Sequence, residues 1–257
     1  MRTNLVFCMA GLYARFRREG YALPKYLLPV EGGQSMLAAI VAPFARSGCF
    51  DRVLFVANRR DEGHRETIET VARTAGAAAE VVFIGDTGGQ AETACLALDV
   101  LAAGGSDGVE KVVFHNVDTI LRNRDFRRLA ALLDEYDGVI DVFDADRPIY
   151  SYVALDAAGT VVDIAEKVVL SRHATSGLYA FASGRRFAET YRRATFPAEA
   201  YISDVYKQML REGARLSVYR AEDPDDTLIL GTPQEYEAYL ATLSLATLGS
   251  HAAEAAV

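Results

Sequence analysis

The feature of this sequence that most constrains its fold is an alternation, through the first half of the chain, of short apolar runs with longer stretches of helical periodicity. The apolar runs are rich in Val, Ile and Phe and predict strands at residues 4–9, 52–58, 80–84 and 111–116. The intervening periodicity predicts helices at about residues 36–46, 64–74, 91–101 and 124–136. Strands that alternate with helices in this way are typical of βαβ units around a parallel sheet, so we expect an α/β fold.

The apolar runs become more closely spaced after Gly138, which indicates mixed strand pairing in the second half. Residues 156–159 form a hairpin-like turn between two of these runs. We predict strands at residues 138–143, 151–155, 160–164, 177–182 and 216–220, and helices at 185–193, 202–212 and after Pro233. The 257 residues contain no linker rich in Pro, Gly or Ser, so we predict one domain over residues 1–248 and a flexible tail over 249–257.

The composition excludes some classes of partner. The formal net charge of −8 argues against a nucleic-acid polymer, because proteins that bind one usually carry a basic excess. No apolar stretch approaches the roughly 18 residues that span a bilayer, and the run after Arg2 is better explained as a buried strand than as a signal peptide. We therefore expect a cytoplasmic protein without a membrane partner. The cysteines lack metal-ligand spacing and are expected to be buried thiols.

The loop after the first predicted strand, residues 10–25, is locally basic in an acidic protein. Ala10 and Gly11 let the backbone approach a ligand at the carboxyl end of a strand, where open α/β sheets bind their ligands. The segment contains one acidic residue, Glu19, and four cations, Arg15, Arg17, Arg18 and Lys25. A triphosphate suits this cluster, and the alternative is a surface loop whose charges face water.

Two further loops follow predicted strands at the same edge of the sheet. Residues 85–93 are glycine-rich and open a helix, whose N-terminal amides favour an anion or a polar ligand edge. Asp118 follows the strand at 111–116, where a carboxylate can hold Mg²⁺ beside phosphates. The plainer alternatives are an ordinary helix start for residues 85–93 and a capping or turn role for Asp118.

The segments AGLYARF and LPKYLLPV, in this order and spacing, resemble the signature of the sugar-phosphate nucleotidyltransferases, A-G-x-G-x-R followed by P-K-x-L-[LIV]-P-[LIV]. The resemblance implies a Rossmann-like (GT-A type) fold, with a mixed, mainly parallel sheet flanked by helices in one domain. It also implies that Arg15 and Lys25 hold the phosphates of the nucleoside triphosphate and the acceptor. Tyr13 stands where the family usually has its second glycine, so this chain departs from the family in the phosphate loop itself.

Further similar segments extend along nearly the whole chain and imply roles for other residues. In the first half, to about residue 140, the resemblance implies a nucleotide site formed by Ala10, Gly11, Gly89, Gln90 and Asn116, with Gly89 and Gln90 at the base. In the second half, about residues 141–248, it implies an acceptor site formed by Glu166, Lys167 and Thr175.

The metal site is less complete by this resemblance. Family members often add an aspartate two residues before the glycine of G-T-P, and this chain has Ile229 at that position. We expect Asp226, just upstream, to substitute and to hold Mg²⁺ together with Asp118. The alternative for Asp226 is a solvated acidic turn.

The implied reaction is in-line attack by an acceptor phosphate oxygen on the α-phosphorus of a nucleoside triphosphate, with release of pyrophosphate. The motifs M-A-G-x-x-x-R-F, P-K-Y and G-Q-A-E-T resemble most closely a subset found among capsule and surface-polysaccharide genes, and on this basis we rank CTP slightly above UTP or dTTP. The acceptor is expected to be a phosphorylated small molecule such as a sugar 1-phosphate, and an oligomer is compatible with the sequence. Two alternatives stay open: a GT-A type glycosyltransferase with a D-x-D metal motif at Asp144 and Asp146, and a non-catalytic nucleotide-binding homologue.

Overall fold

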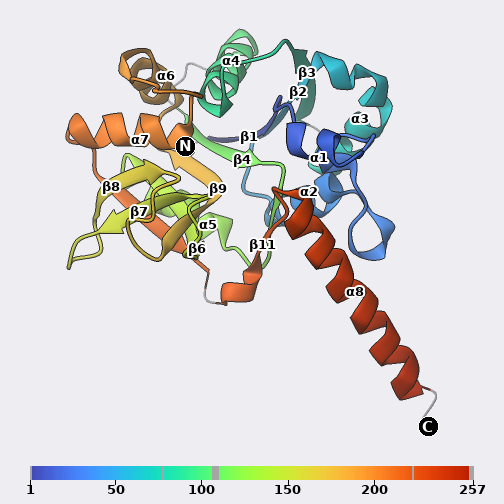
Figure 1. The fold of residues 1–257 in the computed structure, drawn as a ribbon. Coiled ribbons are helices and arrows are strands. Elements are labelled where there is room, and N and C mark those ends of the chain that lie inside the picture. Colours follow the sequence, from blue (N-terminus) through green and yellow to red (C-terminus); the bar gives the residue numbers. More distant parts are fainter. Residues whose placement is uncertain (1, 77, 106–109, 222, 255–257) are drawn as a thin grey trace.

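The computed structural model describes residues 2–76, 78–105, 110–221 and 223–254, with a central sheet between two layers of helices (Figure 1). Four parallel strands form one side of the sheet, in the order β3-β2-β1-β4. Their bounds are Thr3–Met9 for β1, Arg52–Asn58 for β2, Ala79–Ile84 for β3 and Lys111–Asn116 for β4. Because these strands are parallel, the loops that follow them leave from one edge of the sheet.

The other side of the sheet mixes parallel and antiparallel pairs. Strand β9 (His173–Phe181) runs antiparallel to β4 and to β6 (Gly138–Asp144), while β10 (Leu216–Arg220) is parallel to β6. Strands β7 (Ser151–Leu155) and β8 (Val161–Glu166) form an antiparallel hairpin that joins the sheet through β9. The prediction of a single α/β domain with a mixed sheet flanked by helices is confirmed.

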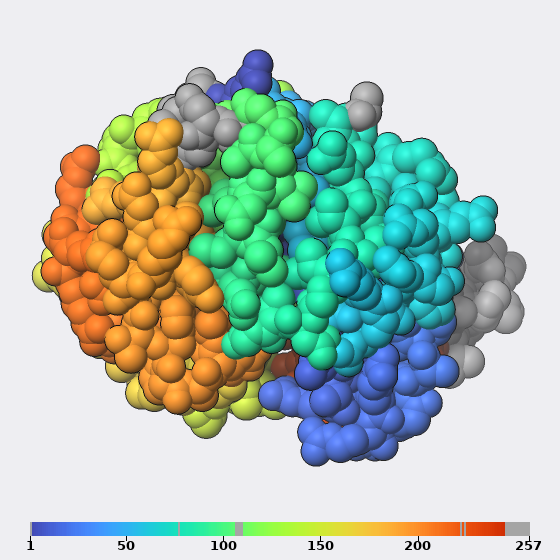
Figure 2. Space-filling model, turned by 90° about the horizontal axis from the view of Figure 1, so that it is seen from above, coloured from blue at the N-terminus to red at the C-terminus, as the bar shows by residue number. Residues whose placement is uncertain are grey.

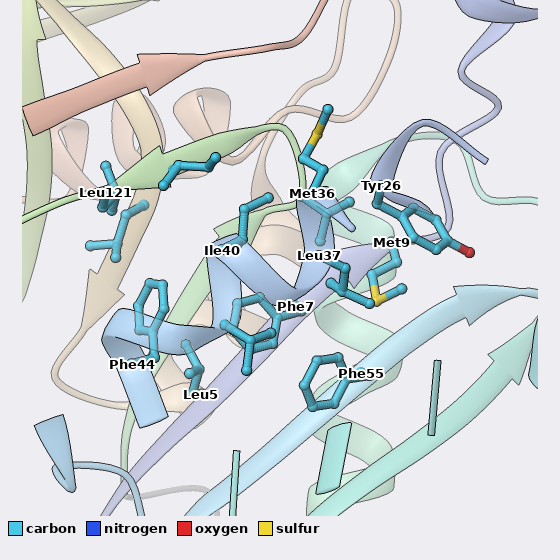
Figure 3. Close-up of a cluster of buried hydrophobic side chains, with 14 of the residues drawn as sticks. Leu5, Phe7, Met9, Tyr26, Met36, Leu37, Ile40, Phe44, Phe55 and Leu121 are labelled. Carbon is cyan, nitrogen blue, oxygen red and sulfur yellow. The ribbon is translucent and has the colours of Figure 1, made fainter. Parts of the chain in front are cut away.

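Side-chain alternation along the central strand β1 divides the core between the two faces of the sheet. Leu5, Phe7 and Met9 belong to the buried cluster on one face (Figure 3), and Val6 belongs to the cluster on the other. Complete burial of one such side chain stabilises the fold by about 1.5–3 kcal/mol, so both faces need helices to exclude water.

Each face of the sheet is covered by its own set of helices. Residues from α2, α3, α5 and α8 complete the first cluster, and residues from α4, α6 and α7 complete the second. The bounds are Met36–Ser47 for α2, Arg65–Thr74 for α3, Gln90–Ala103 for α4, Phe126–Leu132 for α5, Gly184–Arg193 for α6 and Ile202–Arg211 for α7. Every helix expected in these regions is present.

Local sequence explains where α2 begins and ends. The Ser35 side chain accepts a hydrogen bond of 3.2 Å from the Ala38 amide and so caps the first turn. Gly48 follows the last turn in a left-handed conformation with φ of 58°, which glycine adopts without strain. Both features agree with the predicted helix at residues 36–46.

Several element limits differ from the prediction. Helix α5 begins at Phe126 because the Asp125 side chain accepts a hydrogen bond of 2.9 Å from the Arg128 amide and caps the helix there. The predicted loop 10–25 contains a short helix, α1 (Ala14–Arg18). Strands β5 (Thr119–Leu121) and β11 (Thr227–Ile229) pair antiparallel in a separate small sheet. Such three-residue strands depend on a distant partner, which a local pattern does not reveal.

Helix α8 (Pro233–Glu254) starts beside the sheet and extends away from it (Figure 1). Its first turn is fixed because the Thr232 amide donates a 2.9 Å hydrogen bond to Glu235 Oε2 while the Glu235 amide donates to Thr232 Oγ1. Residues 249–254, which we predicted as part of a flexible tail, belong to this helix, and residues 255–257 lie outside the described residues. No helix in the described ranges combines the length and hydropathy needed to cross a bilayer.

Candidate active site

A cleft with about 1130 Å³ of empty space, including the part open to solvent, lies at the carboxyl ends of β1 and β4. In the space-filling view, an indentation separates the blue N-terminal segments from the orange and yellow segments of the second half (Figure 2). The sequence-predicted residues that line the cleft are Gly11, Arg15, Lys25, Gln90, Asn116, Asp118, Glu166 and Thr175. The fold therefore brings most of the predicted nucleotide and acceptor residues to one place.

Lys25 and Asp118 form an ion pair in the floor of the cleft. Lys25 begins the 3₁₀ helix η1 (Lys25–Leu27), and its Nζ lies 2.6 Å from Oδ2 of Asp118, which follows β4. Both side chains are only 18% exposed. Burial by itself raises the pKa of Asp118, but the Lys25 ammonium ion more than offsets this, so the pKa lies below its ordinary value. Asp118 is therefore an anion at neutral pH.

The turn that carries Asp118 is supported from below by a buried histidine. His115 is fully buried in β4, and its Nε2 donates a 3.0 Å hydrogen bond to the Thr119 carbonyl. Burial lowers the pKa of His115 to about 4, so the ring is neutral and does not compete with Lys25 for the Asp118 carboxylate. The hydrogen bond spans the turn and fixes its direction.

Arg15 lies in the first turn of α1 and lines the cleft. No carboxylate within the described ranges forms an ion pair with its side chain. Tyr13, just before the helix, has φ of 36° and ψ of 41°. These left-handed angles are ones that glycine adopts readily, so the backbone has the type of conformation available to the family's glycine although the side chain is large.

Gln90 and Asn116, both predicted for the nucleotide, lie together in the cleft. The Gln90 Nε2 amide donates a hydrogen bond to Asn116 Oδ1, and both residues line the cleft. Strand β9 passes close behind them at Gly177, where φ is 88° and an added Cβ would lie 2.5 Å from Asn116 Nδ2. Glycine at position 177 therefore gives Asn116 the space that it occupies.

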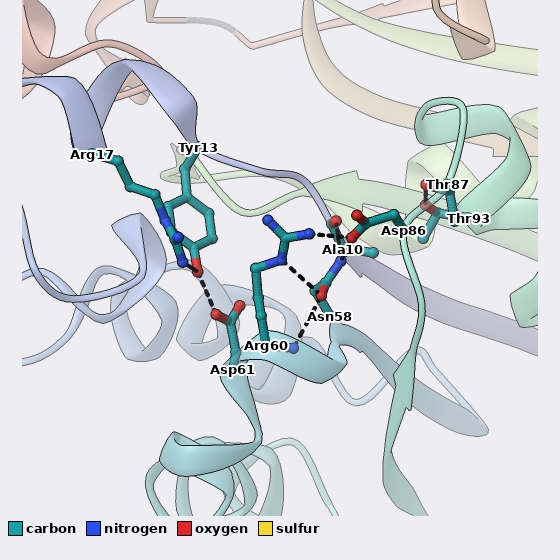
Figure 4. A network of polar contacts seen from close by, with 9 residues as sticks. All are labelled: Ala10, Tyr13, Arg17, Asn58, Arg60, Asp61, Asp86, Thr87 and Thr93. Carbon is teal, nitrogen blue, oxygen red and sulfur yellow. Dashed lines mark hydrogen bonds and ion pairs between the residues drawn. The ribbon is translucent and has the colours of Figure 1, made fainter.

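Two of the residues predicted for the nucleotide have a structural position behind the cleft. The Ala10 carbonyl accepts a hydrogen bond of 3.2 Å from Asn58 Nδ2 (Figure 4), and Ala10 is 3% exposed. Gly89 lies against the backbone of Ala200, where an added Cβ would be 2.5 Å from the Ala200 nitrogen and oxygen. Neither residue lines the cleft, so the expectation that Gly89 contacts the base has no support in its position.

The Glu166 carboxylate, predicted for the acceptor, accepts hydrogen bonds from Ser151 Oγ and, at 3.2 Å, from Ser203 Oγ. Lys167 does not line the cleft. Its Nζ lies 2.7 Å from the Tyr201 hydroxyl and 3.7 Å from Glu166 Oε1, at the rim. Glu166 is the last residue of β8, and Lys167 directly follows it.

Thr175 lines the cleft from β9 and forms a hydrogen bond of 2.9 Å with the hydroxyl of Tyr179, four residues further along the same strand. It is 5% exposed. The predicted strand began at Gly177, but β9 begins at His173, so Thr175 is held by the sheet itself and not by a loop.

Glu235 lines the cleft but was not predicted as a site residue. Its Oε1 accepts a 2.7 Å hydrogen bond from Tyr150, and its Oε2 accepts one of 3.0 Å from Thr232 Oγ1. An added Cβ on Gly231 would lie 3.2 Å from Asp118 Oδ2 and 3.6 Å from Glu235 Oε2, so the two carboxylates come close together beside this glycine. The sequence signal available was the capping pattern T-x-x-E, which indicates a helix start and no ligand.

The metal prediction is only partly supported by position. Asp226 is 7% exposed, does not line the cleft, and accepts a 2.7 Å hydrogen bond from Asn123 Nδ2. The structure therefore does not bring Asp226 to Asp118, while Ile229 does line the cleft. The pairing of β11 with β5 explains this, because it directs the backbone of residue 226 toward Arg122.

The oxygen donors of the cleft fit a hard divalent cation for which substrate and water supply most of the ligands. Asp118 supplies one buried anionic carboxylate, and Glu235 supplies a second close to it beside Gly231. No group of three or more His, Cys, Asp or Glu suited to a metal occurs in the described ranges. Mg²⁺ commonly uses one or two protein carboxylates beside phosphate oxygens, so this donor set matches its habits.

The D-x-D pattern considered for a glycosyltransferase lies outside the cleft. Asp144 forms ion pairs with Arg172 and, at 2.7 Å, with Arg220. The hydrogen bonds from Arg172, with the charge of Arg220, lower the pKa of Asp144 below its ordinary value. Neither Asp144 nor Asp146 lines the cleft, so this pattern offers the cleft no metal site.

A mixed, mainly parallel sheet with a cation–carboxylate pair at the carboxyl ends of its parallel strands is suited to an enzyme that handles phosphates. The family model described as "Nucleotidyl transferase" matches residues 15–238. The chain therefore belongs to the nucleotidyl transferase family and is a nucleotidyltransferase.

Solved structures agree with this assignment. A nucleoside-diphosphate-sugar pyrophosphorylase from Vibrio cholerae RC9 is similar, with 27% identity and a TM-score of 0.82 over 92% of this chain and 99% of that chain. A putative glucose-1-phosphate thymidylyltransferase from Bacillus anthracis shares the fold at 17% identity and a TM-score of 0.74, over 94% and 95% of the two chains. The inositol-1-phosphate CTP transferase from T. maritima does so at 14% identity and a TM-score of 0.68, over 93% and 94%. No curated protein matches the sequence significantly.

Proposed function

We propose that this enzyme transfers a nucleoside monophosphate from a nucleoside triphosphate to a phosphorylated small molecule such as a sugar 1-phosphate, and releases pyrophosphate. The observation that carries the proposal is the Lys25–Asp118 ion pair of 2.6 Å in a cleft that Arg15 also lines. Two cations and one buried anion suit the meeting of two phosphate groups, because the attacking phosphate is already ionised and needs neutralisation more than proton removal.

Each side of the cleft receives one reactant in this proposal. Gln90 and Asn116 present amide groups that donate and accept, which suits a nucleotide base edge. The backbone at Gly11 lies beside the triphosphate, with Arg15 on its phosphates. Across the cleft, Glu166 accepts hydrogen bonds from the acceptor's hydroxyls, while Lys167 at the rim attracts the acceptor phosphate. Residues 1 to about 140 thus serve the nucleotide, and 141–248 the acceptor.

We propose that Asp118 holds Mg²⁺, with Glu235 as the second candidate carboxylate. The ion would neutralise the triphosphate and stabilise charge on its oxygens when bound. Lys25, whose ammonium group donates to the Asp118 carboxylate, would use a second N–H to contact a phosphate oxygen of the substrate.

The choice of nucleotide and acceptor is inferred from resemblance. CTP ranks slightly ahead of UTP and dTTP, because the motifs M-A-G-x-x-x-R-F and G-Q-A-E-T resemble those of capsule and surface-polysaccharide nucleotidyltransferases. The solved relatives include a thymidylyltransferase and a CTP transferase, so this fold accommodates both bases. We propose a cytoplasmic enzyme of surface-polysaccharide precursor synthesis that uses no nucleic-acid polymer and no membrane as partner.

The test is pyrophosphate release measured with CTP, UTP, dTTP, ATP and GTP against a panel of phosphorylated sugars, polyols and amines, with Mg²⁺ present and after its removal by chelation. We expect release that needs both a triphosphate and a phosphorylated acceptor, and that stops on chelation. Binding of a triphosphate without pyrophosphate release for any acceptor would instead support a non-catalytic homologue. Release of a nucleoside diphosphate from a nucleotide-sugar would support glycosyl transfer.

A further inference from the structure

Asp61 is a buried carboxylate that accepts hydrogen bonds from two tyrosines, Tyr13 within the basic loop of residues 10–25 and Tyr26 directly after it. We call residues 10–26 the phosphate loop. It is 1% exposed and lies in the 3₁₀ helix η3 (Arg59–His64), which follows β2. The Tyr13 hydroxyl donates to its Oδ1 (Figure 4), and the Tyr26 hydroxyl donates to its Oδ2 at 2.8 Å. Among the described residues, no cation forms an ion pair with Asp61. A buried carboxylate is unfavourable unless its hydrogen bonds are complete, so both tyrosines are needed at this site.

The two tyrosines flank the two cations of the cleft. Tyr13 lies two residues before Arg15, at the start of α1, and Tyr26 directly follows Lys25 in η1. The chain between them loops out over residues 14–25, so the cations would otherwise depend on a long exposed segment for their positions. Asp61 itself does not line the cleft, whereas the two tyrosines and the two cations do. One carboxylate is therefore connected to both cations by one tyrosine each.

The backbone of Tyr13 has a strained conformation that the contacts of its side chain stabilise. Its φ of 36° is unfavourable for a residue with a Cβ. The hydrogen bond to Asp61 offsets this strain, together with the Arg17 guanidinium, which lies 4.9 Å from the ring centroid and donates to the Tyr13 hydroxyl at 3.2 Å. The conformation sets the direction in which α1 leaves the sheet, and with it the position of Arg15.

We propose that Asp61 is a positioning residue that clamps the phosphate loop through Tyr13 and Tyr26, and thereby holds Arg15 and Lys25 in the geometry that phosphate transfer needs. The proposal rests on the roles of Arg15 and Lys25 in the proposed function. It also accounts for the tyrosine at the position where the family has a glycine: the hydroxyl at position 13 reaches a buried acceptor that no glycine could use.

The clamp acts on the transition state because it fixes charges before the substrate arrives. Two long, flexible cations lose conformational freedom when they bind phosphates, and a loop that is already fixed reduces this loss. Preorganised cations raise kcat more than they lower KM, since the charge that they stabilise develops as the α-phosphorus is attacked.

The test compares kcat and KM for the three clamp variants Tyr13→Phe, Tyr26→Phe and Asp61→Asn. We expect each tyrosine variant to lower kcat about fivefold to thirtyfold, and Asp61→Asn, which weakens both contacts, to lower it about a hundredfold. KM for the triphosphate should change less than threefold. The double variant Tyr13→Phe/Tyr26→Phe should lose about as much kcat as Asp61→Asn. Adding Asp61→Asn to the double variant should lower kcat little further, because all three changes act through one carboxylate.

The matched control is Tyr206→Phe. It removes a buried tyrosine hydroxyl that donates a hydrogen bond of 2.8 Å to the Ala180 carbonyl, and Tyr206 belongs to the core cluster on the other face of the sheet. It should lower the unfolding midpoint by as much as the clamp variants while kcat stays within twofold. If the clamp variants behave like this control, with lower midpoints and unchanged kcat, the Asp61 contacts are only structural and the proposal is wrong. If Asp61→Asn fails to fold, the two tyrosine variants take its place in this comparison.

A second readout needs no substrate. Trypsin cuts after arginine, and the exposed Arg17 and Arg18 lie between the two tyrosines. We expect the clamp variants to be cut in residues 15–18 at least five times faster than the wild type and Tyr206→Phe, because the loop opens more often. If the wild type releases no pyrophosphate with any substrate, the proposed function fails, and these cleavage rates still decide the clamp. Equal rates in all variants would overturn it.

Discussion

We call the side of the cleft with Arg15, Lys25 and Asp118 the first wall, and the side with Glu166 the second wall. The two walls hold their charged groups by different means. On the first wall Lys25 forms an ion pair with Asp118, at 2.6 Å, so opposite charges are in direct contact. On the second wall the nearest partners of Glu166 are the hydroxyls of Ser151 and Ser203, and the nearest cation, Lys167, is 3.7 Å away. Glu235 is similar, with hydroxyl donors at 2.7 and 3.0 Å and the Arg147 guanidinium at 3.7 Å.

The difference teaches which wall is fixed and which can adapt. A buried ion pair defines one geometry, and either charge left alone is strongly unfavourable. A carboxylate held by hydroxyls keeps its charge available and exchanges these donors for hydroxyls of a ligand. We therefore expect changes on the first wall to reduce turnover for every substrate, and changes on the second to alter the choice of acceptor.

The strongest challenge to this comparison is Asp118→Asn. It removes the anion that holds Lys25 and the proposed Mg²⁺ ligand, so we expect kcat to fall by about 10³–10⁴-fold. Pyrophosphate release across a range of Mg²⁺ concentrations measures the effect. Asp226→Asn is the matched control, since this carboxylate bonds to Asn123 outside the cleft, and its kcat should stay within about tenfold. An equal loss of kcat in both variants would support the original prediction that Asp226 is a metal ligand.

Arg15→Ala should have the next largest effect. The guanidinium has no carboxylate partner in the described residues and is free to bind phosphate, so its loss should reduce kcat about 10²–10³-fold. The same assay measures it. Arg18→Ala, a neighbouring arginine that does not line the cleft, should keep kcat within about twofold, because surface substitutions have small effects. Near-normal turnover in Arg15→Ala would remove this residue from the first wall's function.

Glu166→Gln sharpens the contrast by testing the second wall. The amide keeps one acceptor oxygen but loses the charge, so we expect KM for the acceptor to rise about tenfold while kcat and KM for the triphosphate change less than about threefold. Initial rates with each substrate varied in turn separate these constants. A fall in kcat without a change in acceptor KM would show that both walls act on the reacting phosphates.

Glu235→Gln is expected to have the smallest effect on turnover. It weakens the cap at the start of α8, so the free energy of unfolding should fall by about 0.5–1.5 kcal/mol. Because Asp118 remains as a carboxylate, kcat should fall less than about twofold. Denaturant unfolding and pyrophosphate release together measure the two quantities. A loss of turnover as large as that of Asp118→Asn would make Glu235 a full partner in the metal site.

The sequence predicted most of the first wall because topology brings strand ends together. Gly11, Asn116 and Asp118 follow or end parallel strands, so a correct strand assignment was sufficient to place them in one cleft. Arg15 and Lys25 needed the resemblance to a family as well. The strand and helix assignments of this region succeeded for the same reason, since buried parallel strands give continuous apolar runs.

The residues that sequence reasoning misplaced depend on contacts between distant segments. Asp226 was chosen for its nearness in sequence to the expected aspartate, but the pairing of β11 with β5 turns it toward Asn123. Gly89 was predicted to contact the base, but its lack of a side chain allows the backbone of Ala200 to approach closely. Asp61 was not predicted at all, because nothing local marks a carboxylate whose donors lie 35 and 48 residues away.

Gly231 limits how this active site can change by mutation. Every other amino acid carries a Cβ, and a Cβ here would lie 3.2 Å from Asp118 Oδ2, a tight contact with a carboxylate that is already paired with Lys25. Any substitution at this position therefore requires the Asp118 carboxylate to shift. We therefore expect changes of substrate to arise by mutation at other positions around the cleft, such as Gln90 and Glu166, whose hydrogen bonds are with neutral side chains.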